Sequence, residues 1–137
     1  MQPQTYDADI LLAQLLGEFA ANLEQLGFRV ESTAEPLGGS LSVDVVCLRR
    51  VLDNLLDNLR KYADPAAPVQ IRTVAENGCT VWLENRVLPA PQGVESNRIG
   101  LKICEKILRQ TGGSFDGGAE RGIYRTRITL PLTAKRP

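Results

Sequence analysis

The stretch that decides the fold is residues 48–62, which reads LRRVLDNLLDNLRKY. At about 100° per residue, its apolar side chains form one stripe of a helix, which predicts that they are buried. Asn54, Asn58 and Lys61 recur at i, i+4 and i+7 and therefore share one line at the edge of that stripe. We predict a helix whose Asn and Lys side chains line a cleft beside a sheet. The apolar stripe consists of Leu48, Val51, Leu52, Leu55, Leu59 and Tyr62. The opposite, charged side of the helix consists of Arg50, Asp53, Asp57 and Arg60.

Hydrophobic patterns on either side of this helix predict an α+β protein. Helices are expected where apolar residues recur at helical spacing, and strands where they alternate. Strand pairs are joined by hairpins, as at Glu76-Asn77-Gly78, which favours a two-layer α/β sandwich. Its sheet is expected to be mixed and mostly antiparallel, with about three helices on one face. The expected helices are 9–26, 44–63 and 99–110, and the expected strands are 28–33, 41–43, 69–75, 80–83, 114–115 and 124–130.

The 137 residues fit a single domain. We assign residues 9–133 to it, with residues 1–8 as a frayed lead-in and residues 134–137 as a C-terminal tail. Asp9 is expected to cap the first helix at its N-terminus, and Gly27 to end that helix.

Composition excludes several kinds of function. Lys plus Arg and Asp plus Glu both number 16, so the net charge is zero and gives no support for nucleic-acid binding. The chain contains no histidine, which excludes Ser-His-Asp triads, histidine general bases and histidine-ligated metals. Its three cysteines form no CxxC pair, which fits a reducing cytoplasm rather than a disulfide framework. No apolar run is long enough to span a membrane.

The line of two amides and one ammonium suits a phosphate-bearing ligand. An Asn carbonyl oxygen is a hard, neutral ligand for Mg²⁺, which takes its other ligands from water and phosphates. A Lys one turn further along neutralises phosphates as a point charge. On spacing alone the alternative stays open that these side chains only solvate the boundary of the buried stripe.

Residues 54–62, NLLDNLRKY, closely resemble the N box, N-L-L-x-N-A-x-K-Y, of the Bergerat-fold ATPases. Residues 99–107, IGLKICEKI, resemble the family's second glycine box and the helix that follows it. Gly112-Gly113 and the final Leu130-Pro131 match later positions of the same pattern. The ordered set covers nearly the whole chain, and it is most similar to the ATP-binding catalytic domains of sensor histidine kinases.

The resemblance implies a site for ATP and Mg²⁺ on this helix. Asn58 takes the Mg²⁺-binding position, and Lys61 reaches the triphosphate and assists phosphoryl transfer. Asn54 lies near the waters of the metal, where it would orient one of them during catalysis. Tyr62 packs on or beside the adenine, although a core aromatic that closes the helix is an alternative explanation of this residue.

The first glycine box departs from the family's D-x-G-x-G pattern. Asn85 stands where the family has the Asp that accepts a hydrogen bond from the adenine amino group, and both glycines are absent. The Asn oxygen still accepts this bond but carries no charge, so we expect roughly tenfold weaker binding. Glu84 is expected on the opposite face of the strand and cannot replace the Asp.

The second glycine box, G-x-G-L-G-L in the family, retains only Gly100. The helix that begins near Ile99 still offers unpaired N–H groups to phosphate, so Ile99, Gly100 and Leu101 are expected at the nucleotide. Arg98 is expected either to contact a phosphate or to be an exposed arginine of the ATP lid. That lid, residues 86–98, is short for the family and lacks its usual phenylalanine.

The expected function is that of the catalytic domain of a bacterial two-component sensor histidine kinase. Such a domain transfers the γ-phosphoryl group of ATP to a histidine of an adjoining dimerisation domain, which this chain lacks, and a response regulator is an indirect partner. The fragment alone is expected to be a monomer that cannot phosphorylate itself on histidine. The full-length protein is expected to be a membrane-bound homodimer with this part in the cytoplasm. Alternatives are a degenerate, non-catalytic module of the same fold and an anti-sigma-type serine kinase.

Overall fold

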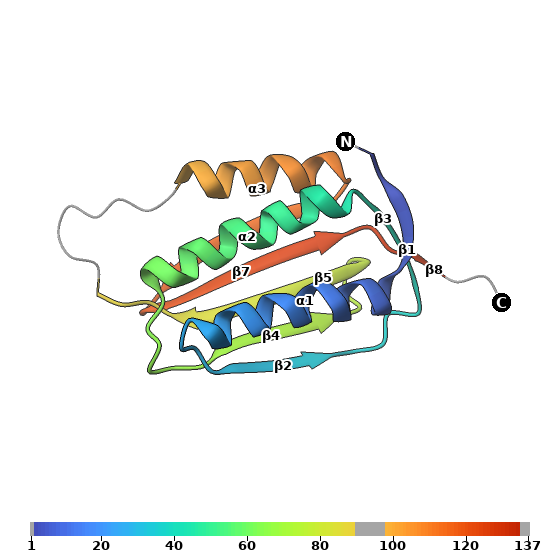
Figure 1. Ribbon diagram of the computed structural model, residues 1–137. Coiled ribbons are helices and arrows are strands. Elements are labelled where there is room, and N and C mark those ends of the chain that lie inside the picture. The colour runs from blue at the N-terminus through green and yellow to red at the C-terminus, as the bar shows by residue number, and fades with distance from the viewer. Residues whose placement is uncertain (1, 90–97, 135–137) are drawn as a thin grey trace.

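The structure is a computed structural model that describes residues 2–89 and 98–134, with the backbone alone for residues 98–100. Along the described chain, strands precede, separate and follow the three helices (Figure 1). The elements are β1 (Gln4–Asp7), α1 (Ala8–Gln25), β2 (Val30–Ala34), β3 (Gly39–Val43), α2 (Val45–Tyr62), β4 (Val69–Val74), β5 (Cys79–Arg86), α3 (Arg98–Gln110), β6 (Ser114–Glu120), β7 (Ile123–Leu130) and β8 (Thr133–Ala134).

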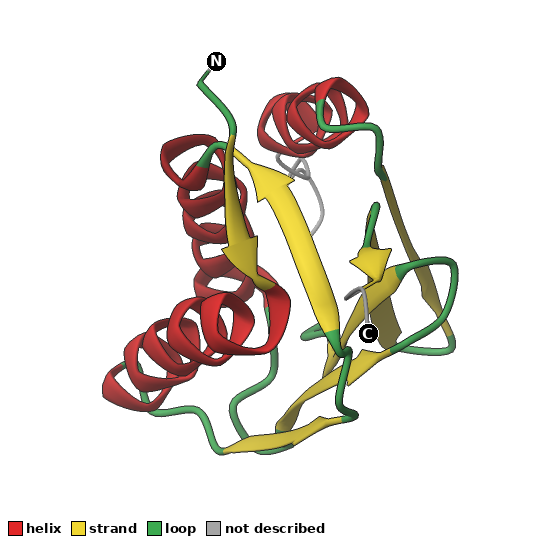
Figure 2. Ribbon diagram, turned by 90° about the vertical axis from the view of Figure 1, so that its right-hand side faces the viewer, coloured by secondary structure: helices red, strands yellow, loops and turns green. Residues whose placement is uncertain are grey.

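The strands form two sheets, and the larger one supports the three helices. Its five strands lie in the order β2-β4-β5-β7-β6, where β2 and β4 are parallel and every other pair is antiparallel. A smaller antiparallel sheet has the order β1-β3-β8. The helices α1, α2 and α3 all lie on one side of the larger sheet (Figure 1, Figure 2). The predicted α+β sandwich is therefore confirmed.

Helix α2 forms where the sequence predicts it. The Asp44 side chain caps its N-terminus by accepting a hydrogen bond from the Cys47 N–H at 3.2 Å. The helix ends at Tyr62 because Ala63 turns to an extended conformation just before Asp64-Pro65. The residues Leu48, Val51, Leu52, Leu55 and Leu59 are buried as predicted, whereas Tyr62 is half-buried.

The cap of α1 differs from the prediction. Asp7, not Asp9, is the N-cap, and its Oδ1 accepts a hydrogen bond from the Ile10 N–H at 3.0 Å. Asp9 lies in the first turn of the helix and accepts hydrogen bonds from the main chain of Leu37, at 2.8 Å, and of Gly38, at 3.1 Å. Asp7 takes the cap because it ends strand β1 and therefore already has an extended backbone.

The fold extends beyond the predicted domain limits at both ends. Residues 4–7, predicted as a frayed lead-in, pair with β3, so that Gln4 lies opposite Val43 and Asp7 opposite Ser40. At the other end, Ala134 lies opposite Gly39 in the pairing of β8 with β3. Both pairings depend on residues far apart in the sequence, which a local hydrophobic pattern does not reveal.

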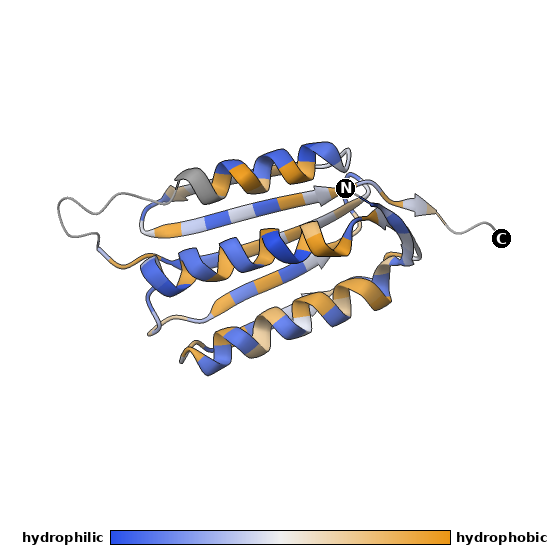
Figure 3. Ribbon diagram, turned by 45° about the horizontal axis from the view of Figure 1, so that its top comes forward, coloured by the Kyte–Doolittle hydropathy of each residue, from blue (hydrophilic) through white to orange (hydrophobic). Residues whose placement is uncertain are grey.

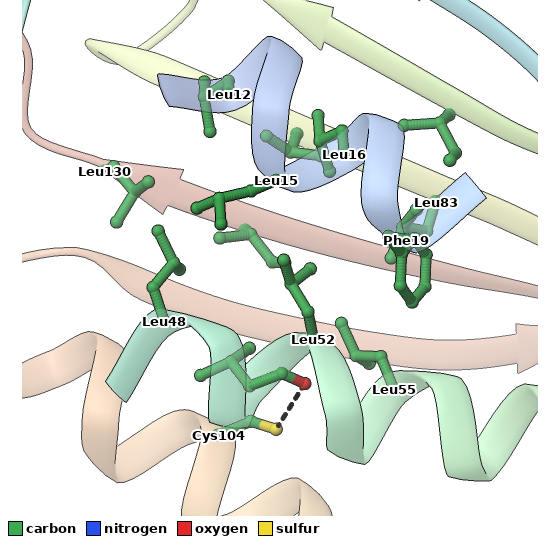
Figure 4. Close-up of a cluster of buried hydrophobic side chains, with 14 of the residues drawn as sticks. Leu12, Leu15, Leu16, Phe19, Leu48, Leu52, Leu55, Leu83, Cys104 and Leu130 are labelled. Carbon is green, nitrogen blue, oxygen red and sulfur yellow. Dashed lines mark hydrogen bonds between the residues drawn. The ribbon is translucent and has the colours of Figure 1, made fainter. Parts of the chain in front are cut away.

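The main hydrophobic core lies between the helices and the larger sheet. Leucines of α1 and α2 meet above the sheet, together with Leu83 of β5 and Leu130 of β7 (Figure 4). The helices are banded with hydrophobic and hydrophilic residues, as expected for helices that cover a sheet on one side (Figure 3). The tight hairpin predicted between β4 and β5 is present, with Asn77 and Gly78 both at positive φ, 51° and 87°.

The opposite face of the larger sheet carries the protein's single tryptophan, Trp82. Its neighbours Val81 and Leu83 belong to the core, so alternation along β5 directs Trp82 away from the helices. Arg72 and Arg127 are its register partners on the two adjacent strands. The Arg127 guanidinium lies 5.8 Å from the centre of the Trp82 ring and also pairs with Asp116 at 2.6 Å.

Candidate functional site

Three elements that carry predicted site residues end at the same side of the molecule. The C-terminal end of α2, the C-terminal end of β5 and the N-terminal end of α3 all lie at the left of Figure 1. The turned view of Figure 3 gives the same arrangement for α2 and α3. Helix α2 also packs directly against α3. The fold thus brings together segments that are distant in the sequence.

The two asparagines of α2 have buried polar atoms without hydrogen-bond partners. Asn54 and Asn58 are both half-buried. Among the described residues, Asn58 Oδ1 and Asn54 Nδ2 are buried and make no hydrogen bond of ordinary geometry. Buried polar atoms nearly always have a partner, and an unpaired one costs about 1–3 kcal/mol. An unpaired amide oxygen at this position fits the ligand that a hard cation such as Mg²⁺ would require.

Lys61 has a partner that the sequence analysis did not assign. Its Nζ lies 3.0 Å from Asp57 Oδ2, and Arg60 pairs with the other carboxylate oxygen, Oδ1, at 2.7 Å. The hydrogen bond from Arg60, followed by that from Lys61, holds the pKa of the Asp57 carboxyl below its ordinary value. The Lys61 side chain is 41% exposed, so the ion pair lies at the surface beside the asparagine line.

The end of α2 is fastened to the chain that follows β5. The main-chain oxygen of Tyr62 accepts a hydrogen bond from the Leu88 N–H at 2.8 Å. One residue further on, Ala63 forms an isolated bridge with Val87. Asp64 donates its N–H to the Arg86 oxygen at 2.8 Å. Tyr62 is therefore placed at the junction of α2 with the chain leaving β5.

Asn85 lies on the helix-facing side of β5, near the end of that strand. It is 8% exposed and follows the core residues Val81 and Leu83 at intervals of two. Its Nδ2 donates a hydrogen bond to the Arg86 oxygen at 3.2 Å. Glu84 lies on the other face, where its carboxylate is 3.6 Å from Arg125 Nε, which confirms the predicted alternation.

The sequence analysis missed two polar residues on the same face of β7. Tyr124 is the register partner of Asn85, and Thr126 is the partner of Leu83. Thr126 is 3% exposed, whereas Tyr124 is half-buried, and loss of solvent raises the pKa of its hydroxyl. A Cβ on Gly117 would lie 2.5 Å from the Tyr124 hydroxyl, so the neighbouring strand leaves room for the ring. The alternation from Tyr124 to Leu130 was the available signal, since it aligns both polar residues with the buried Ile128.

The start of α3 lies partly outside the described residues. The helix begins at Arg98, one residue before the predicted Ile99. The side chains of Arg98 and Ile99, the surroundings of Gly100 and residues 90–97, which include most of the predicted lid, lie outside what the structure describes. Leu101 is half-buried and packs against the hydrophobic core.

The Gly112-Gly113 pair ends α3 for a steric reason. Gly112 has a φ of 83°, a conformation that favours glycine. A Cβ on Gly113 would lie 2.0 Å from the main-chain oxygen of Thr129 in β7. The two glycines therefore allow the chain to leave α3 and enter β6 in close contact with β7.

Within residues 2–89 and 101–134, no group of three or more His, Cys, Asp or Glu side chains is arranged to bind a metal. A cation here would have to bind to amide oxygens, water and the oxygens of its own ligand. No helix of the described chain is long and apolar enough to cross a membrane.

The two-layer sandwich is similar in fold to solved catalytic domains of histidine kinases. The nucleotide-free catalytic domain of the histidine kinase ThkA superposes with a TM-score of 0.75 at 16% identity, over 98% of this chain and 100% of that one. The mycobacterial sensor histidine kinase MprB gives a TM-score of 0.72 at 17% identity, over 97% and 99% of the two chains.

Two curated proteins are similar in sequence. The sensor histidine kinase YrkQ of Bacillus subtilis (strain 168) is 29% identical in an alignment of 118 positions that covers 80% of this chain and 27% of YrkQ. The sensor protein VanSC of Enterococcus gallinarum is 27% identical in an alignment of 154 positions that covers 96% of this chain and 42% of VanSC. The chain thus spans less than half the length of these relatives, and no protein-family model matches it. The predicted resemblance to the Bergerat-fold ATPases, closest to histidine-kinase catalytic domains, is confirmed.

Proposed function

We propose that this chain is the ATP-binding catalytic domain of a two-component sensor histidine kinase. The reaction would transfer the γ-phosphoryl group of ATP to a histidine on an adjoining dimerisation domain of the same full-length protein. This chain has no histidine of its own, so alone it would bind nucleotide without phosphorylating itself on histidine. We further propose that the isolated domain is a monomer, that the full-length protein is a homodimer with this part in the cytoplasm, and that a response regulator receives the phosphoryl group from the histidine.

The observation that supports this proposal most directly is the unpaired Asn58 Oδ1. This oxygen would hold a Mg²⁺ ion, and the bound ion would supply charge neutralisation for the phosphates. Asn54 lies one turn earlier on the same line of the helix, and it would orient water beside Asn58. Lys61 gives its ammonium to the triphosphate as a point charge. Each of these residues either positions a reacting group or neutralises phosphate charge, and these are the main tasks of a protein in phosphoryl transfer.

Adenine would bind at the same end of the fold, beside Asn85 and Tyr62. The Asn85 oxygen accepts a hydrogen bond from the adenine amino group, and Tyr62 lies beside the ring. The phosphates meet the N-terminus of α3, where Arg98, Ile99, Gly100 and Leu101 supply main-chain N–H groups and Arg98 adds a positive charge. We propose the same end of the fold as the place where the dimerisation domain presents its histidine.

The test is calorimetric titration of the domain with a non-hydrolysable ATP analogue, with and without Mg²⁺. We expect saturable binding that requires Mg²⁺, is lost in Asn58→Ala and is impaired in Lys61→Ala. Asn22→Ala is the control, because Asn22 is exposed, belongs to α1 and is not one of the proposed site residues. Absence of binding at millimolar analogue would refute the proposal.

Asn85 also motivates a second candidate, a degenerate module of the same fold that acts only by interaction. Its amide replaces the Asp of the family pattern, and its Nδ2 is already engaged by the Arg86 oxygen. The phosphotransfer step separates the two candidates. When the domain is mixed with its histidine-bearing dimerisation domain and γ-labelled ATP, the kinase labels the histidine, whereas the degenerate module does not.

A further inference from the structure

We propose that Asp57 is a positioning residue that restrains Lys61, so that the triphosphate competes with this carboxylate for the ammonium. The inference rests on the proposed nucleotide site and deepens it, because it names a regulator of affinity within the same helix. The sequence places Asp57 on the charged side of the predicted helix, and that position alone does not indicate such a role.

Lys61 forms an ion pair with Asp57. The distance from Lys61 Nζ to Asp57 Oδ2 is 3.0 Å, and Arg60 holds Oδ1 at 2.7 Å. Each oxygen of the carboxylate thus has a cation of its own. Because Arg60 keeps the carboxylate in place, Lys61 meets an acceptor that is already oriented.

The helix places Asp57 and Asn58 on opposite sides of Lys61. At about 100° per residue, Lys61 lies between Asp57 and Asn58 when the helix is viewed along its axis. Asn58 lies on the side of the buried stripe and has the unpaired buried oxygen, whereas Asp57 lies on the outer side and is 35% exposed at its side chain. The ion pair therefore draws the ammonium outward, away from the asparagine line.

The Asp57–Lys61 ion pair is weak enough to lower the affinity for the triphosphate without preventing its binding. A partly exposed ion pair contributes little, and a triphosphate has several negative charges with which to displace the carboxylate. Removing the carboxylate releases Lys61 and also removes one negative charge near an anionic ligand. Both effects act in the same direction, so Asp57→Asn should bind the triphosphate more tightly.

The experiment compares the affinity of a Mg²⁺-ATP analogue for the wild type, Asp57→Asn, Asp57→Glu and Asp53→Asn. Asp53 is the matched control, because it lies one turn earlier on α2, is exposed and forms no ion pair within the described residues. At low salt we expect Asp57→Asn to bind about twofold to fivefold tighter, with a smaller gain at high salt. Asp53→Asn should bind the analogue with about the affinity of the wild type. Asp57→Glu should do the same, because it keeps the carboxylate.

Two further measurements separate positioning from a general effect of charge or structure. Adenosine has no phosphate, so its affinity should be the same in Asp57→Asn and in the wild type. In a Lys61→Met background, Asp57→Asn should give a smaller gain in affinity than in the wild type, because the restrained ammonium is gone and only the removal of the negative charge remains. Asp57 is partly exposed, so its variants should keep the unfolding midpoint of the wild type within a few degrees.

The outcomes distinguish failure of this inference from failure of the proposed function. Unchanged or weaker analogue binding by Asp57→Asn, while Lys61→Met impairs binding, would overturn the inference and leave the nucleotide site standing. An equal gain in the Lys61→Met background or in Asp53→Asn would overturn it as well. If the wild type does not bind the analogue, the proposed function fails, and the inference fails with it.

Discussion

The Cys104 thiol of α3 donates a hydrogen bond to the main-chain oxygen of Val51 in α2, across 3.7 Å (Figure 4). Cys104 is fully buried, and this burial raises the pKa of its thiol to about 11, although the nearby Asn54 side chain opposes the rise. The contact joins the helix that begins at the proposed phosphate site to the helix that carries Asn54 and Asn58.

The burial of two of the three cysteines predicts which thiols react with an alkylating reagent. Cys79 and Cys104 are buried, and burial raises the pKa of both thiols to about 11, so at pH 8 neither supplies thiolate to an alkylating reagent. Cys47 is only partly buried. Brief treatment of the folded protein with iodoacetamide should therefore modify Cys47 alone, and treatment in urea should modify all three cysteines. Mass spectrometry of peptides measures this, and modification of Cys104 in the folded protein as fast as that of Cys47 would contradict it.

The same two thiols predict a loss of stability at alkaline pH. Their pKa values are about 11 in the folded protein against 9.0 for an ordinary thiol, so the folded state retains protons that the unfolded state has lost. The free energy of unfolding should thus be unaffected by these groups below pH 9 and should fall as the pH rises toward 11. Urea unfolding at pH 8, 9 and 10 tests this, and Cys47→Ser should show the same fall.

Replacement of Asn58 should leave the fold intact while it abolishes nucleotide binding. Asn58→Ala removes a buried oxygen that has no partner among the described residues, so the free energy of unfolding should change by less than about 1 kcal/mol or increase. The adjacent Leu59→Ala is the control, because Leu59 is 7% exposed in the core and its truncation should cost about 2–5 kcal/mol. Urea unfolding measures both, and a large loss in Asn58→Ala would mean that its amide supports the fold.

Asn85→Asp should restore a charged acceptor for adenine. If Asn85 occupies the adenine-reading position, the affinity for ATP should rise by up to about 1–2 kcal/mol. The free domain should lose stability, because the Asp carboxylate cannot donate the hydrogen bond that the Arg86 oxygen now accepts from Nδ2. Glu84→Gln, on the opposite face of the same strand, is the control and should not change the affinity. Unchanged or weaker binding by Asn85→Asp would show that this end of β5 does not contact adenine.

Gly113 is predicted to be essential for stability, and Gly118 is not. A Cβ on Gly113 would lie 2.0 Å from the main-chain oxygen of Thr129, so Gly113→Ala should cost about 3 kcal/mol or more. Gly118 has no atom within 4 Å of an added Cβ, and Gly118→Ala should stay within about 0.5 kcal/mol. Thermal unfolding of the two variants gives the comparison, in which equal midpoints would disprove the steric explanation.

The sequence predicts the elements whose signals are local. Helix α2 carries its own cap at Asp44, its own apolar stripe and its own stop before Pro65, so it required no knowledge of the rest of the fold. The hairpin at Asn77-Gly78 is local in the same way, because its two residues adopt positive φ. The pairing of Lys61 with Asp57 was also accessible, since residues at i and i+4 face each other on a helix.

The features that the sequence does not predict depend on contacts between distant segments. Asp7 replaces Asp9 as the cap because residues 4–7 pair with β3, and nothing near Asp9 reveals that pairing. Tyr124 lies beside Asn85 only because β5 and β7 pair in one particular register. The unpaired oxygen of Asn58 depends on how α2 packs against its surroundings, which helical spacing alone does not determine.

The position of Trp82 decides what intrinsic fluorescence can report. This side chain lies on the face of the sheet opposite the helices, with the Arg127 guanidinium above its ring. Its emission should therefore follow the melting of β5 and β7 and remain nearly constant while a ligand fills the space beside α2. A flat tryptophan signal during a titration is thus the normal behaviour of a working domain, and a probe placed on the ligand is the suitable optical reporter.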